Sequence, residues 1–124
     1  MTHPAETYVR DCLRTESKVG MAVLSNQETR LLHSILGLCD EVGELSKALK
    51  AFLFYGKELD YVNLKEEYGD VLWYTSLGID SIQSTLDSVM KANIEKLKIR
   101  YPEKFTKEDA LNRNTGEERK ELEK

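Results

Sequence analysis

Two pairs of carboxylates, each pair set three residues apart, are the side chains of this sequence with the clearest chemical potential. Glu41 and Glu44 form the first pair, and Glu67 and Asp70 form the second. On an α-helix, residues three apart are neighbours, about 5–6 Å between their Cβ atoms. Each pair flanks an apolar stripe, so two helices packed antiparallel could bring the four carboxylates together.

Carboxylates that converge repel one another, and a cation is needed to stabilise the group. Hard oxygen ligands without sulfur or imidazole nearby favour Mg²⁺, with Mn²⁺ as a possible substitute. Because Mg²⁺ often bridges to substrate phosphates, the pattern favours a polyphosphate ester as the substrate. A di-iron centre is disfavoured, since His3 and His33 form no Glu-x-x-His pair. The alternative is that the paired acids are only a solvated helix face.

A third group of polar side chains complements the acids. Asn93 falls inside an apolar stripe, and Lys96 and Arg100 follow on the adjoining flank. Beside a metal, these groups are suited to contact phosphate and sugar; the alternative is a satisfied amide beside two surface cations. Lys57, on a predicted loop, could also reach a phosphate.

The spacing of apolar residues predicts the helices that must carry these groups. An all-α protein is expected, with helices from Pro4 to Thr15, from Gln27 to Phe54, from Asn63 to about Ile82, and from Ser84 to just before Pro102. Gly56 is suited to end the second helix. Asn63 with Glu66, and Ser84 with Asp87, are predicted to cap the next two.

Composition narrows the class of protein further. A length of 124 residues fits one domain. The net charge of −4 argues against binding to a nucleic-acid polymer. No run is long and apolar enough for a membrane span, and the first residues lack signal-peptide features, so a cytoplasmic protein is expected. Cys12 and Cys39 have no metal-site spacing. The domain is predicted to cover residues 1–114, with a charged, flexible tail at 115–124.

The third predicted helix is apolar on more than one side. Trp73, Tyr74 and Leu77 lie away from its main apolar stripe. In so small a protein, a second subunit is the expected cover, which predicts a homodimer or homotetramer.

The ordered motifs resemble those of the MazG-type all-α nucleoside triphosphate pyrophosphohydrolases, in their short stand-alone or phage-encoded form. Besides the two acidic pairs, the run Gly69–Tyr74, the run Asn93–Leu97 and the triplet Arg100–Pro102 match. Together they cover about residues 31–114.

The resemblance implies a four- to five-helix bundle completed by oligomerisation and a reaction that releases pyrophosphate and a nucleoside monophosphate. It implies that Mg²⁺ is bound by Glu41, Glu44, Glu67 and Asp70, with Glu41 or Glu44 as the general base. The substrate-binding residues expected are Asn93, Lys96, Arg100, Tyr101, Tyr74, Lys57, Trp73 and His33. Two alternatives remain: a non-catalytic interaction module, or the same fold acting on a nucleoside diphosphate or on phosphoribosyl-ATP.

Overall fold

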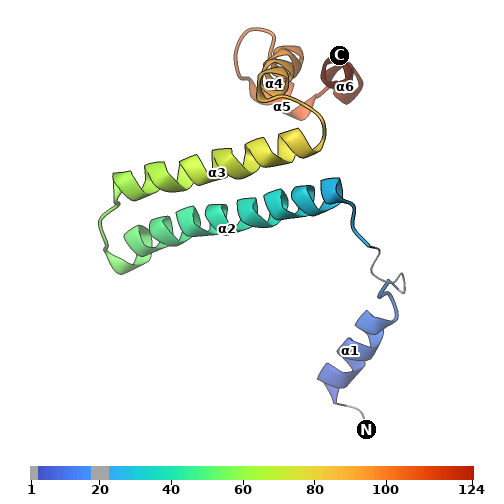
Figure 1. The fold of residues 1–124 in the computed structure, drawn as a ribbon, viewed down its shortest axis with the longest axis vertical. Helices are drawn as coiled ribbons and strands as arrows, with labels where there is room; N and C mark the ends of the chain where they lie inside the picture. Colours follow the sequence, from blue (N-terminus) through green and yellow to red (C-terminus); the bar gives the residue numbers. More distant parts are fainter. Residues whose placement is uncertain (1–2, 18–22) are drawn as a thin grey trace.

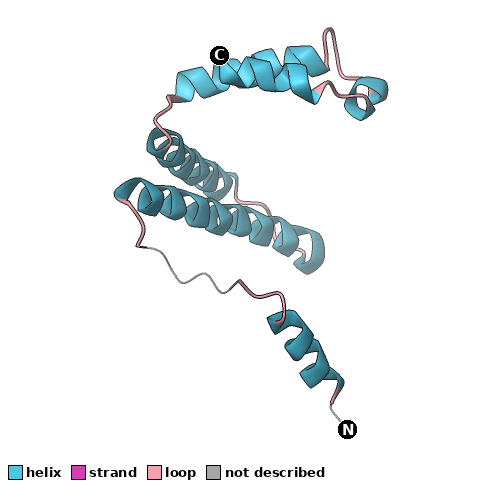
Figure 2. Ribbon diagram, turned by 90° about the vertical axis from the view of Figure 1, so that its right-hand side faces the viewer, coloured by secondary structure: helices cyan, strands magenta, loops and turns pink. Residues whose placement is uncertain are grey.

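The computed structural model describes residues 3–17 and 23–124, and the regular elements there are all helices (Figure 2). In chain order they are α1 (Pro4–Leu13), α2 (Asn26–Tyr55), α3 (Tyr61–Ser81), α4 (Leu86–Arg100), α5 (Lys107–Leu111) and α6 (Thr115–Glu123). The predicted all-α class is confirmed. The described part has six helices rather than four or five, because two short helices follow α4.

Helices α2 and α3 form an antiparallel hairpin, and they lie side by side along most of their length (Figure 1). A capping box between Ser25 and Glu28 begins α2. Gly56 ends it in the left-handed conformation, with φ of 67°, as its position in the sequence predicts. The short connection that follows reverses the chain into α3.

Small residues let the two helices of the hairpin approach closely. A Cβ on Gly37 would overlap the ring of Tyr74, and a Cβ on Gly78 would overlap the hydroxyl of Ser34. The Ser34 hydroxyl donates to the Tyr74 carbonyl at 2.6 Å. This contact fixes how α2 is rotated against α3, and therefore which side chains face each other.

Two predicted helix caps are wrong by one to three residues. Asp60, not Asn63, caps α3, because its carboxylate accepts from the backbone N–H groups of Val62 and Asn63. Thr85, not Ser84, caps α4, and its capping-box partner is Ser88 rather than Asp87. In both places a neighbouring residue has the same capping chemistry.

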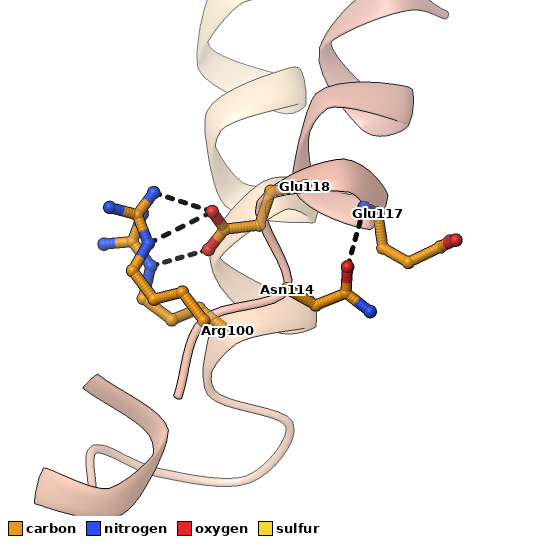
Figure 3. Close-up of polar contacts among 5 residues, drawn as sticks. Arg100, Asn114, Glu117 and Glu118 are labelled. Atoms are coloured by element: carbon orange, nitrogen blue, oxygen red, sulfur yellow. Dashed lines mark hydrogen bonds and ion pairs between the residues drawn. The ribbon is translucent and has the colours of Figure 1, made fainter. Parts of the chain in front are cut away.

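The charged C-terminal segment forms a helix in the structure, where the sequence predicts a flexible tail. Helix α6 packs along α4 (Figure 2). The carboxylate of Glu118 is buried between the guanidinium groups of Arg100 and Arg113 (Figure 3). The domain boundary at residue 114 stays a prediction.

One chain buries little apolar surface. Among the described residues, Ile79 is the one large hydrophobic side chain that is buried. On the hairpin, Phe54, Tyr61 and Val62 are each at least 75% exposed. Helix α1 lies apart from the hairpin in both views (Figures 1 and 2).

Within the described residues, no helix is long and apolar enough to cross a membrane.

Candidate metal centre

Three of the four predicted metal ligands lie together at the middle of the hairpin. Glu41 comes from α2, whereas Glu67 and Asp70 come from α3 and lie three residues apart on it. One carboxylate oxygen from each lies within 4.8 Å of the other two. Glu41 and Glu67 are half-buried and Asp70 is exposed, so the group is open to solvent on one side.

The electrostatics of this group favour a bound cation. A side-chain hydrogen bond with Glu67, then burial, then the negative charges of Asp70, Glu67 and Asp40 raise the pKa of Glu41 from 4.5 to about 7. In residues 3–17 and 23–124, no ion pair joins a lysine or arginine to the three carboxylates. An all-oxygen, uncompensated donor set fits a hard divalent ion such as Mg²⁺.

The fourth predicted ligand, Glu44, is not part of the three-carboxylate group. It lies three residues beyond Glu41 on α2 and is exposed. The sequence alone does not separate Glu44 from Glu41, since their spacing places both on one side of α2. The rotation of α2 against α3 brings Glu41 to the acids of α3 and leaves Glu44 outside.

One residue beside the acids has a contact that the sequence reading missed. The Asn63 amide donates a hydrogen bond from Nδ2 to Oε1 of Glu67 at 3.1 Å, and the contact is partly buried. The spacing of four residues on one helix is the signal that could have found it. The predicted capping role of Asn63 obscured that signal.

Three of the four predicted aromatic residues form one cluster on the hairpin. The His33 ring lies edge-on to Trp73 and Tyr74, with centroid distances of 6.2 and 5.7 Å. Trp73 and Tyr74 contact each other at 5.0 Å. Because Trp73 and Tyr74 follow Asp70 by about one helical turn, the cluster adjoins the acids. Trp73 is 57% exposed, so part of this aromatic surface is open to solvent.

The predicted substrate-binding residues of α4 do not meet the acids within one chain. Asp70 is followed by about 16 Å of helix before α3 ends at Ser81, at the usual rise per residue. Helix α4 begins beyond that end and packs chiefly on α6 (Figure 1). Asn93 is exposed, rather than enclosed in an apolar stripe, and Lys96 is half-buried.

Two further predicted residues, Arg100 at the end of α4 and Tyr101 just after it, make contacts with the C-terminal part of the chain. Arg100 donates from Nε to Glu118 at 2.7 Å. The Tyr101 ring packs on Phe105, with 5.5 Å between centroids. Lys57 lies elsewhere, exposed in the connection between α2 and α3.

Comparison with known protein families gives a match that covers most of α2 and all of α3 and α4. The sequence model of the MazG nucleotide pyrophosphohydrolase domain matches residues 30–105, which is more than half of the chain. The matched segment includes the three-carboxylate group, Glu44, the aromatic cluster and α4. Comparisons with curated proteins and with solved structures give no match.

Proposed function

The chain belongs to the MazG nucleotide pyrophosphohydrolase domain family, and from this premise we propose that it hydrolyses the α–β phosphoanhydride of a nucleoside triphosphate. The products are a nucleoside monophosphate and pyrophosphate. The observation that carries the proposal is the group formed by Glu41, Glu67 and Asp70, which lies inside the matched segment. The resemblance of its motifs to those of triphosphate pyrophosphohydrolases supports the same reaction.

The three carboxylates are the proposed ligands of Mg²⁺, for which Mn²⁺ is a substitute. When bound, the cation neutralises phosphate oxygens and lowers the pKa of the attacking water. The residues themselves supply the negative charge that draws a cation to this point of the hairpin. A polyanionic substrate is therefore expected to bind together with the cation.

Glu44 is the proposed general base, and Glu41 is the alternative. Glu44 lies one turn from Glu41 and outside the three-carboxylate group, so its oxygens are not committed to that group. A carboxylate in this place is suited to take a proton from water beside the metal centre.

A second copy of the chain is proposed to complete the substrate site. The exposed apolar side chains of the hairpin need a cover, which self-association as a dimer or tetramer supplies. In that assembly, we propose that Asn93 and Lys96 of one chain contact the phosphate and sugar of a substrate bound at the acids of the other chain. Their distance from the acids of their own chain supports this assignment. Trp73 and His33 are assigned to the base, since the Trp73 ring is partly open to solvent.

A panel of natural and modified nucleotides, assayed for pyrophosphate and for orthophosphate, tests the reaction. Magnesium-dependent pyrophosphate release from triphosphates is the expected result. Orthophosphate as the main product would contradict the proposed bond cleavage. Activity confined to nucleoside diphosphates or to phosphoribosyl-ATP would contradict the proposed triphosphate substrate but not the membership of the family.

The exposed aromatic and aliphatic surface also favours a second candidate, a non-catalytic module that binds a partner protein. Thermal melts distinguish the two candidates. The enzyme is expected to melt higher with Mg²⁺ and a non-hydrolysable triphosphate. An unchanged melting temperature, together with absent hydrolysis, would favour the interaction module.

A further inference from the structure

Asn63 lies beside the candidate metal centre, and its side-chain hydrogen bond with Glu67 has no role in capping α3. Asp60 already accepts the backbone N–H groups at the start of α3. The amide of Asn63 is therefore free to reach along the helix, and Nδ2 donates to Oε1 of Glu67 at 3.1 Å. Both side chains are half-buried, which shields the contact from competing water.

The chemistry of this donor differs from that of a cation. A lysine or arginine at the same place would compete with a metal ion for the carboxylate, because both carry positive charge. The neutral amide of Asn63 restricts the torsion angles of Glu67 without cancelling its charge. The bond from Asn63 is to Oε1, so Asn63 leaves Oε2 of Glu67 available to a ligand, or to the proton that Glu41 and Glu67 share in its absence.

We propose that Asn63 is a positioning residue that holds the Glu67 carboxylate in the orientation required for binding a divalent cation with Glu41 and Asp70. The inference rests on the proposed function, since it requires that the three carboxylates bind Mg²⁺. Hydrogen bonds to metal-binding side chains fix their orientation, and losing one costs about 10–100-fold in metal affinity.

Two substitutions at the same position separate the amide donor from the shape of the side chain. Asn63→Leu keeps a similar size and removes the donor, whereas Asn63→Gln keeps a donor on a longer side chain. Leucine and glutamine both favour helices more than asparagine does, so the start of α3 is retained in each variant. Asn112→Ala is the matched control, because it removes an asparagine hydrogen bond from the end of α5.

The readouts are Mg²⁺ affinity by isothermal titration calorimetry without nucleotide, and the Mg²⁺ concentration that gives half-maximal pyrophosphate release. Asn63→Leu is expected to weaken Mg²⁺ binding about 10–100-fold, with an unchanged melting temperature in the absence of metal. Asn63→Gln is expected to recover part of the affinity, and Asn112→Ala to bind as the wild type does. At saturating Mg²⁺, the turnover of Asn63→Leu should approach that of the wild type.

Wild-type Mg²⁺ affinity in Asn63→Leu would overturn the positioning role while leaving the proposed function in place. Equal weakening in the Leu and Gln variants would also overturn it, since the loss would then not depend on the donor. A wild-type protein that neither binds Mg²⁺ nor releases pyrophosphate would instead refute the proposed function, and the inference with it.

Discussion

Glu118 of α6 and Arg100 of α4 form a buried ion pair, with 2.7 Å between Oε1 and Nε (Figure 3). The Glu118 side chain is only 3% exposed, and its other oxygen, Oε2, lies 2.7 Å from a terminal guanidinium nitrogen of Arg113. Removing one partner of a buried pair leaves the other charges uncompensated. The pair therefore attaches the C-terminal helix to α4, and it engages an arginine that the sequence assigns to the substrate.

Glu118→Gln is expected to lower the melting temperature by several degrees, because both arginines lose their counter-charge. Circular dichroism melts at neutral pH measure this change. Glu117→Gln is the matched control, since it removes an exposed ion pair with Lys120 on the same helix and should leave the melting temperature nearly unchanged. Equal effects of the two substitutions would contradict the proposed role of the buried pair.

The same carboxylate predicts a dependence of stability on pH. Hydrogen bonds from Arg100 and Arg113 lower the pKa of Glu118 from 4.5 to about 2. Because the folded-state pKa is lowered, its contribution is complete above pH 4.5 and is lost as the pH falls toward 2. The difference in unfolding free energy between the wild type and Glu118→Gln should shrink over that range. A constant difference would contradict the lowered pKa.

Substitutions in the acids should separate metal binding from turnover. Glu41→Gln and Asp70→Asn are expected to abolish most Mg²⁺ binding measured by calorimetry, and pyrophosphate release with it. Glu44→Gln is expected to retain Mg²⁺ binding but to lose about 100-fold or more in kcat, as for a general base. All three should keep the helical circular dichroism spectrum. Loss of Mg²⁺ binding in Glu44→Gln would place Glu44 among the ligands instead.

The raised pKa of Glu41 gives a second titration to measure. In metal-free protein, side-chain NMR should show this carboxyl titrating near pH 7, whereas Glu67→Gln should shift it back toward 4.5. Because the folded-state pKa is raised, the metal-free protein should lose stability as the pH rises from 4.5 to 7. A midpoint near 4.5 in the wild type would contradict the close approach of the three acids.

Gly37 should tolerate no side chain. Gly37→Ala places a Cβ against the Tyr74 ring, and overpacking of this kind costs about 1–3 kcal/mol in unfolding free energy. Gly43→Ala on the same helix meets open space in the chain. That control should be neutral or stabilise the protein by about 0.5–1 kcal/mol, since alanine favours helices over glycine. Denaturant unfolding measures the free energy of unfolding of both variants. Equal values for the two would refute a tight α2–α3 contact.

Local sequence rules predicted much of the fold because helices are local structures. The apolar spacing of α2, the glycine that ends it, and the three-residue spacing of the acids follow from helix geometry alone. The differences are also local: Asp60 and Thr85 occupy the capping positions that the sequence predicts for Asn63 and Ser84. Several residues nearby can cap a helix equally well, so the first turn is the least determined part.

The sequence by itself determined the family motifs, the helical class and the two acidic pairs, since each depends on residues within a few turns of one another. The tertiary structure decided which acids meet. The contacts of Gly37 and Ser34 with Tyr74 set the rotation of α2 against α3, so Glu41 reaches Glu67 and Asp70 while Glu44 stays outside. It also decided that Arg100 binds Glu118, because packing of α6 on α4 brings together residues that no local rule connects.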